Sequence, residues 1–149
     1  MSEYYTSENG FIEQVLSEHG VYASVVRGVS MKPLLHQGKD VVYIVPLTEK
    51  VKKYDVLLYN RNGKYILHRV IGFYPEGYVI RGDNTYFKEY IPTGEVVGIL
   101  TKYYKNGREY SASGRRFLLY GLLVQIFYVP RYIFVMLKRK ISKLVKKTK

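Results

Sequence analysis

Short segments rich in β-branched and aromatic residues, separated by turn signals, constrain the fold of this chain most. Such segments favour strands, and an Asn-Gly pair accepts the positive φ of a tight hairpin. Two of these pairs, Asn62-Gly63 and Asn106-Gly107, follow strand-like segments. The predicted strands cover residues 21–29, 41–45, 56–59, 64–73, 78–81 and 95–104. The sequence therefore predicts a mainly β domain of short antiparallel strands, at the spacing of a sandwich or barrel.

A short amphipathic helix is predicted before the strands. Its apolar residues recur at helical spacing on one face, and Gly20 ends it. These apolar residues are Phe11, Ile12, Val15 and Leu16. The residues before them are polar and acidic, unlike a secretory signal, so we expect the N-terminus to stay in the cytoplasm.

The composition excludes some kinds of site and locates the charge. The chain has no cysteine, which excludes disulfides, thiolate metal sites and a cysteine nucleophile, and we expect no cofactor and no metal ion. Residues 1–114 hold 14 basic and 12 acidic residues, a net charge of +2, whereas residues 115–149 hold ten basic and no acidic residues. We therefore expect no nucleic-acid binding, and an anionic membrane surface as a partner of the C-terminal tail.

The tail predicts two amphipathic helices more readily than one membrane span. Residues 117–136 are long and apolar enough to cross a bilayer, but Pro130 and Arg131 interrupt them. A charged residue near the bilayer centre costs about 2.5–3.5 kcal/mol, and proline removes a hydrogen bond. We predict helices at about 116–128 and 131–146, the second lying in a membrane interface; packing of their apolar faces on the domain is the alternative.

These patterns divide the chain into a domain at 1–114 and membrane-associating helices at 115–149. The basic residues of segment 138–149 are expected to remain in the cytoplasm, because positive charge marks the cytoplasmic side of a membrane. We therefore expect the domain to be held on the cytoplasmic face of the cell membrane.

Ser30 lies where a strand-like run breaks and a helical turn, residues 30–35, is predicted to begin. Its hydroxyl can cap that turn, and Pro33 fits a first helical turn. A hydroxyl near free backbone N–H groups also suits a nucleophile, because these groups stabilise a developing oxyanion. Both interpretations of Ser30, helix cap and nucleophile, are open on this stretch alone.

Two further residues are candidates for the partners of a nucleophilic serine. His68 lies on a predicted hairpin arm, and Asp83 lies at a strand end within Gly82-Asp83-Asn84. A nucleophilic serine needs an adjacent base, which is usually histidine, and a carboxylate that fixes the tautomer of the imidazole. Alone, a histidine in a strand and a Gly-Asp-Asn turn are ordinary structural features.

Together and in this order, the motifs resemble the signal peptidase I family and its relatives, the self-cleaving SOS repressors. The resemblance covers residues 24–101. It is carried by Gly-Xaa-Ser-Met-Xaa-Pro at 28–33, Arg-Val-Ile-Gly at 69–72, Gly-Asp-Asn at 82–84 and Val-Val-Gly at 96–98. Histidine precedes the Arg-Val-Ile-Gly box, which is similar to the serine–histidine branch found in the endoplasmic reticulum and in archaea.

This resemblance implies a β-rich catalytic fold and a serine endopeptidase that removes a signal or leader segment from a peptide or protein precursor. It implies Ser30 as the nucleophile and His68 as the general base, with Gly28 and Met31 near the substrate or the oxyanion. Asp83 is slightly favoured as the third member. Glu89 is the alternative acid, because the endoplasmic reticulum branch carries a second acid six residues after its Gly-Asp-Asn aspartate.

The sequence departs from the family at two places. Gly38-Lys39-Asp40 is one residue longer than the Gly-Asp usual after the serine box, and the N-terminal membrane helix of the family has no counterpart here. A non-catalytic peptide-binding module of the same fold, acting as a membrane-bound partner in a peptide-maturation system, is the alternative function.

Overall fold

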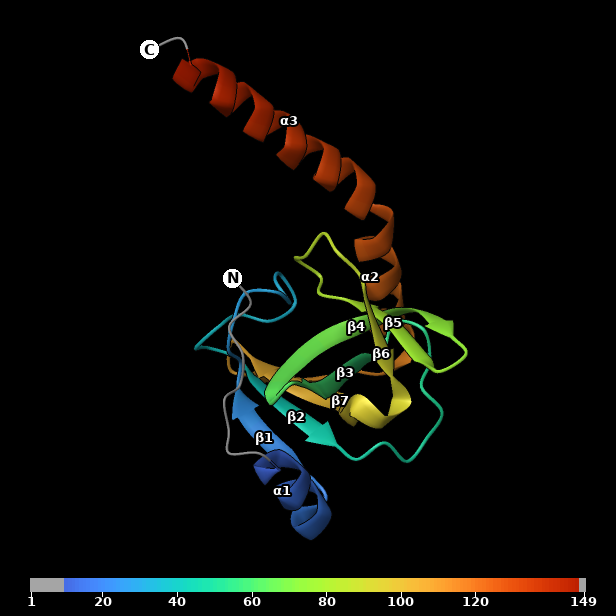
Figure 1. Ribbon diagram of the computed structural model, residues 1–149. Helices are drawn as coiled ribbons and strands as arrows, with labels where there is room; N and C mark the ends of the chain where they lie inside the picture. Colours follow the sequence, from blue (N-terminus) through green and yellow to red (C-terminus); the bar gives the residue numbers. More distant parts are fainter. Residues whose placement is uncertain (1–9, 148–149) are drawn as a thin grey trace.

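The computed structural model describes the backbone of residues 10–147 and the side chains of residues 10–143 (Figure 1). Its elements in chain order are α1 (Phe11–His19), β1 (Tyr22–Val25), β2 (Val41–Val45), β3 (Val56–Arg61), β4 (Lys64–Tyr74), β5 (Gly77–Arg81), β6 (Glu89–Pro92), the 3₁₀ turn η1 (Thr93–Glu95), β7 (Val96–Lys105), β8 (Arg108–Ser111), α2 (Gly114–Ile126) and α3 (Tyr128–Lys147). The predicted mainly β fold, with a short N-terminal helix and C-terminal helices, is confirmed.

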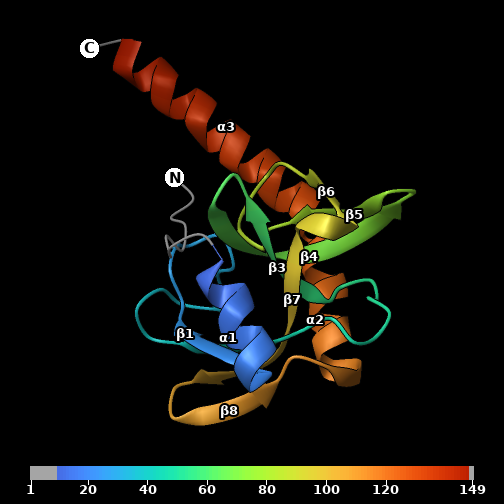
Figure 2. The same ribbon diagram turned by 60° about the horizontal axis from the view of Figure 1, so that its bottom comes forward.

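All strands belong to one antiparallel sheet with the order β1-β2-β7-β3-β4-β5-β6, and β8 pairs with β7. β7 joins the two parts of the sheet, because its first residues pair with β3 and its later residues pair with β2 and β8. Register shifts place an extra residue in β7 opposite β3 (Val97), in β7 opposite β2 (Thr101) and in β4 opposite β5 (Ile71). Such bulges bend strands and increase their twist. The sheet is accordingly curved (Figures 1 and 2).

Both faces of β3 are buried, which divides the core into two clusters. Val56 and Leu58 belong to a cluster that includes residues of α1, β2 and α2, whereas Leu57 and Tyr59 belong to a second cluster with residues of β4, β5 and β6. Successive side chains of a strand point to opposite faces. The unbroken apolar run of β3 therefore supports two layers of core.

Two strands differ from the sequence prediction. β1 ends at Val25 rather than at residue 29, and Gly28 then takes a φ of 78°, which lies outside the extended region of a regular strand. β6 was not predicted, because it has four residues and ends at Pro92, which lacks a backbone donor. β6 matters for the site described below, since it begins at Glu89.

The segment after Ser30 forms no helix. Residues 30–34 are a hydrogen-bonded turn, with N–H of Lys32 donating to O of Val29 and N–H of Leu35 donating to O of Met31. The Lys32–Pro33 peptide bond is cis. The predicted turn at residues 30–35 is a single hydrogen-bonded turn that no helix continues, so Ser30 is not the cap of a helix.

The first C-terminal helix shares the core of the domain. Phe117 and Gly121 of α2 are buried, and Phe117 belongs to the same cluster as residues of α1 and β2. The predicted boundary between residues 114 and 115 therefore divides the chain at a point where the two parts share one core. One side of α2 therefore packs on the domain.

The break between the helices lies at Phe127, between α2 and α3, rather than near Pro130 as predicted. Pro130 instead occupies the first turn of α3, where its missing N–H leaves no bond unmade. Within the described residues, no single helix is long and apolar enough to cross a bilayer. α2 and the part of α3 up to Lys143 reach that length and composition together, with a bend of 41° between them.

Candidate active site

The β3–β4 hairpin determines which side chains share a face with His68. The turn Asn62-Gly63 has φ values of 54° and 77° and joins the strands directly, so that Leu57 lies opposite His68. Tyr59, two residues after Leu57, lies on the same face as His68 and diagonal to it. Arg69, the next residue of β4, points to the other face of the sheet.

The Nδ1 atom of His68 is surrounded by oxygen acceptors. It lies 3.2 Å from Oε1 of Glu89 and 3.3 Å from the hydroxyl of Tyr59. The Tyr59 hydroxyl donates its proton to the same Oε1 at 3.1 Å, and Nη1 of Arg61 donates to Oε2 of Glu89 at 3.0 Å. Because both neighbours of Nδ1 accept, Nδ1 carries the proton of the neutral imidazole and Nε2 carries the lone pair.

Glu89 is held as a carboxylate by these contacts. The hydrogen bond to His68 lowers the pKa of the Glu89 carboxyl most; the charge of His68, the hydroxyl of Tyr59 and the guanidinium of Arg61 lower it further, against partial burial. A carboxylate in this position fixes the imidazole tautomer and stabilises the imidazolium that forms when Nε2 takes a proton.

The Nε2 atom of His68 lies beside the turn that carries Ser30. A Cβ added to Gly82 would lie 2.7 Å from the carbonyl oxygen of Ser30 and 2.9 Å from Nε2 of His68. Nε2 is buried and has no hydrogen-bond partner among the described residues, so Ser30 Oγ does not bond to it in this structure. Gly82 thus leaves room for the serine turn and the lone pair of His68 to approach each other.

Asn84 connects the Ser30 turn to the loop after β5. Its backbone N–H donates to the carbonyl oxygen of Ser30 at 2.7 Å, and its side-chain amide donates to the carbonyl oxygen of Val29 at 3.1 Å. These two bonds fix the position of the serine turn against the Gly82-Asp83-Asn84 segment.

Gly28 and Met31, expected near the substrate or the oxyanion, are both buried. Gly28 has a φ of 78°, which only glycine adopts readily, and the side chain of Met31 packs in the core. Any contact of Met31 with a substrate must therefore come from its backbone rather than from its side chain.

Asp83 is bound to arginine, not to histidine. Its carboxylate accepts hydrogen bonds of 2.7 Å from Nε and Nη2 of Arg69, and both side chains are fully buried. The expectation that Asp83 contacts the imidazole is corrected: the carboxylate next to His68 is that of Glu89. Successive side chains of β4 point to opposite faces of the sheet, so His68 and Arg69 meet different carboxylates.

Tyr59 and Arg61 are members of the site that the sequence interpretation did not single out. A signal for Tyr59 was present, since a two-residue Asn62-Gly63 turn pairs Leu57 with His68 and puts Tyr59 on the same face. Arg61 carries no comparable signal, because its contact with Glu89 depends on β6 lying across the sheet.

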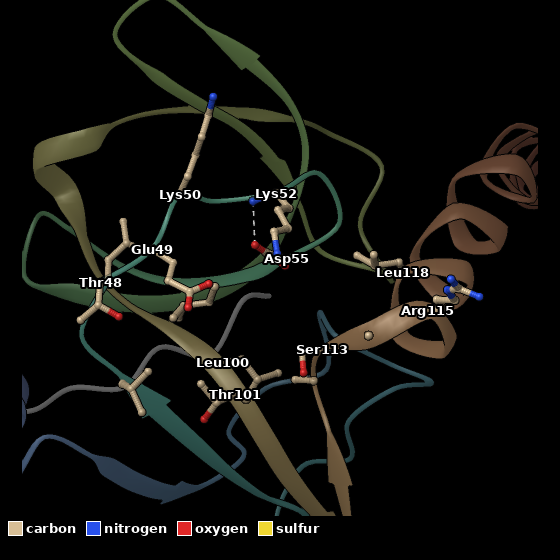
Figure 3. A pocket seen from close by; sticks show the side chains of 15 residues that line it. Thr48, Glu49, Lys50, Lys52, Asp55, Leu100, Thr101, Ser113, Arg115 and Leu118 are labelled. Carbon is tan, nitrogen blue, oxygen red and sulfur yellow. Dashed lines mark hydrogen bonds between the residues drawn. The ribbon is translucent and has the colours of Figure 1, made fainter.

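A separate cavity of about 400 Å³ lies between the loop after β2, β7 and the start of α2 (Figure 3). Its charged lining includes Glu49, Lys50, Lys52 and Arg115, and Asp55, whose carboxylate accepts a 2.7 Å bond from N–H of Lys52. Burial raises the pKa of Asp55. None of the residues around His68 lines this cavity, so it is distinct from the candidate active site.

Among residues 10–147, no three His, Asp or Glu side chains come together in a way that could hold a metal ion. Comparison with models of known protein families and with curated proteins found no match to this chain. The arrangement around His68 therefore has to be interpreted from its own chemistry.

Proposed function

We propose that this chain is a serine endopeptidase of signal peptidase type, which removes a signal or leader segment from a peptide or protein precursor. One observation carries the proposal. Nδ1 of His68 is held by Glu89, while the buried Nε2 has no bond to any described residue and lies beside the Ser30 turn. A histidine with one nitrogen oriented by a carboxylate and the other left as a base is what an activated serine requires.

In the proposed reaction, Ser30 Oγ attacks the scissile carbonyl carbon while Nε2 of His68 takes the hydroxyl proton. The imidazolium then gives this proton to the leaving amine, and the peptide bond breaks to leave an acyl group on Ser30. Nε2 then takes a proton from the water that attacks the acyl carbon. It returns this proton to Ser30 Oγ as the bond between Oγ and the acyl carbon breaks, which releases the acid and the free serine. Glu89 stabilises the imidazolium in both halves, and backbone N–H groups near residues 28–31 are the proposed donors to the oxyanion.

The apo geometry is compatible with this mechanism although Ser30 Oγ does not bond to Nε2. Catalytic hydrogen bonds are often long or absent without substrate and form in the substrate complex. The Ser30 turn is held by two hydrogen bonds from Asn84, which keep it beside Nε2 of His68.

Cleavage profiling tests the proposal. Wild type, Ser30→Ala and His68→Ala are incubated with a peptide library, and new termini are identified by mass spectrometry. We expect both variants to keep the circular dichroism spectrum of wild type and to lose turnover about 10⁴-fold or more. Ser17→Ala and His19→Ala, at exposed positions of α1, are matched controls that should cleave like wild type.

Labelling with a serine-reactive fluorophosphonate separates this proposal from a non-catalytic peptide-binding module. A catalytic serine should be labelled at Ser30 in wild type, and labelling should fall in His68→Ala. Specific peptide binding without cleavage and without a label on Ser30 would instead establish the binding module.

A further inference from the structure

The first turns of α3 contact the loop after β5 through one face of the helix. The hydroxyl of Tyr128 donates to the carbonyl oxygen of Tyr86 at 2.6 Å, and Arg131 bonds to the carbonyl oxygen of Asp83 at 3.2 Å. The ring of Tyr132 packs against that of Tyr86. Tyr128, Arg131 and Tyr132 are spaced i, i+3 and i+4, so they define the side of α3 that faces the domain.

The opposite side of α3 is apolar and turned away from the domain. Ile133, Phe134, Leu137 and Ile141 are each more than half exposed, and their spacing places them on the face opposite Tyr128. The views in Figures 1 and 2 show α3 extending away from the sheet beyond its first turns. This apolar stripe cannot be buried by the domain to which it belongs.

α2 extends the same surface. Its buried residues, Phe117 and Gly121, face the domain, whereas Leu119 and Ile126 on its other side are more than half exposed. Phe127, between the helices, is also exposed. Two consecutive helices thus present apolar faces to the outside, which monomeric soluble domains rarely do.

Charge identifies the occupant of this surface. Residues 115–149 contain ten basic and no acidic residues. Helical spacing places Lys138 and Lys140 on either side of the apolar stripe of α3, and Lys143 lies next to Lys140 on the polar side of the helix. A second copy of the chain would bring the same positive charges into contact, whereas anionic lipid headgroups would neutralise them. An apolar helical face flanked by cations is the arrangement of a helix that lies in a membrane interface.

We propose that the exposed apolar faces of α2 and α3 dock on an anionic bilayer surface, with α3 lying in the interface. This docking holds the candidate active site at the membrane, because Arg131 also contacts Asn84, whose backbone N–H binds the carbonyl oxygen of Ser30. Resting on the proposed function, the substrate class is a precursor peptide that is itself held at the membrane surface.

Vesicle co-sedimentation tests the docking without any need for activity. Wild type and Ser30→Ala should both bind phosphatidylcholine vesicles that contain phosphatidylglycerol, and bind pure phosphatidylcholine vesicles much more weakly. Phe134→Asp should lower binding about tenfold or more through lost apolar burial. Lys138→Gln and Lys143→Gln should each lower it roughly fivefold on anionic vesicles. Phe73→Asp, an equally large exposed side chain on β4, is the control and should bind like wild type.

Two results would overturn the docking proposal. One is equal vesicle binding by wild type and Phe134→Asp. The other is a lipid-independent dimer, seen by light scattering in wild type and absent in Phe134→Asp, which would make a second copy the occupant.

Cleavage of a lipid-anchored peptide then tests the substrate class separately. On anionic vesicles, wild type should cleave a myristoylated form of a library substrate faster than Phe134→Asp does, whereas both should cleave the soluble form equally without vesicles. Equal rates on vesicles would contradict the membrane-held substrate and leave the peptidase proposal standing. Loss of all cleavage with vesicle binding intact would contradict the peptidase proposal alone.

Discussion

Arg69 binds the carboxylate of Asp83 through two hydrogen bonds of 2.7 Å, and neither side chain is exposed to solvent. Arg69 also donates to the carbonyl oxygen of Tyr54 at 2.8 Å and lies over the rings of Phe117 and Tyr120 of α2. This pair therefore links β4, the loop after β5 and α2. It fixes the segment that positions the Ser30 turn, while Glu89 is left to orient His68.

We predict that Asp83→Asn destabilises the fold strongly. The substitution keeps the size of the side chain but leaves the buried guanidinium of Arg69 without its counter-charge, which costs about 3–5 kcal/mol. Urea unfolding followed by tyrosine fluorescence measures the change. Glu109→Gln removes the exposed partner of Lys102 and should change the free energy of unfolding by less than about 1 kcal/mol. A similar loss of unfolding free energy in Asp83→Asn and Glu109→Gln would mean that the Arg69–Asp83 pair does not stabilise the loop after β5.

Much of the sheet was predictable because its local signals agree with its tertiary pairing. The turns at Asn62-Gly63 and Asn106-Gly107 have positive φ at both residues, as their sequence required. The predicted segment 41–45 is β2, and β4 and β7 match their predicted segments closely. α1 also ends as predicted, with Gly20 at a φ of 71°.

The remaining features were not predictable because they depend on contacts between segments that are far apart in the sequence. Asp83 and Glu89 are both acidic residues after β5, and only the face to which His68 and Arg69 point decides which carboxylate meets the imidazole. β6, which carries Glu89, has too few residues for a pattern. At Ser30, the Ser-Met-Lys-Pro run favoured a helical start, but the turn is bound instead by Asn84, 54 residues further along the sequence.

We predict that Glu89→Gln lowers the turnover of the proposed peptidase by about 10²–10⁴-fold. An amide cannot stabilise the imidazolium of His68, and its N–H₂ group disturbs the tautomer that leaves Nε2 as a base. The measurement is kcat for a library peptide that wild type cleaves. The variant keeps the buried Arg69–Asp83 pair. Full activity in Glu89→Gln would remove Glu89 from the mechanism.

Glu89 should also make the stability of the fold depend on pH. Its pKa is lower in the folded chain than the ordinary value of 4.5, mainly because of His68. The charged carboxylate therefore stabilises the fold at pH values above 4.5, and this stabilisation is lost as the pH falls through the lower folded-state pKa. Between pH 6 and 3, wild type should lose more unfolding free energy than Glu89→Gln; parallel curves would contradict the lowered pKa.

We predict that Tyr59→Phe impairs activity more than it impairs folding. The hydroxyl of Tyr59 contacts Nδ1 of His68 and Oε1 of Glu89, so its loss loosens the imidazole, with a fall of about tenfold in kcat and about 1 kcal/mol in stability. Tyr65→Phe is the matched control, since Tyr65 is equally buried and its hydroxyl donates to Glu13 at 2.5 Å, away from His68. Equal falls in kcat for both variants would assign Tyr59 a structural role only.

The narrow space around Gly82 leads to the last prediction. A Cβ at this position would lie 2.7 Å from the carbonyl oxygen of Ser30 and 2.9 Å from Nε2 of His68, both closer than carbon tolerates. The Ser30 carbonyl also accepts the bond from Asn84, so it cannot move without breaking that bond. Gly82→Ala should therefore push Ser30 and His68 apart, costing about 1–3 kcal/mol in stability and abolishing cleavage.

Gly94 provides the control for this substitution. A Cβ at Gly94 meets no atom within 4 Å, so Gly94→Ala should leave both stability and cleavage close to wild type. The NMR signals of the His68 ring report the displacement directly, because its Nε2 would face a methyl group in Gly82→Ala. If Gly82→Ala stayed active with unshifted His68 signals, Ser30 and His68 would not meet across Gly82. The proposed Ser30–His68 pair would then have no structural basis.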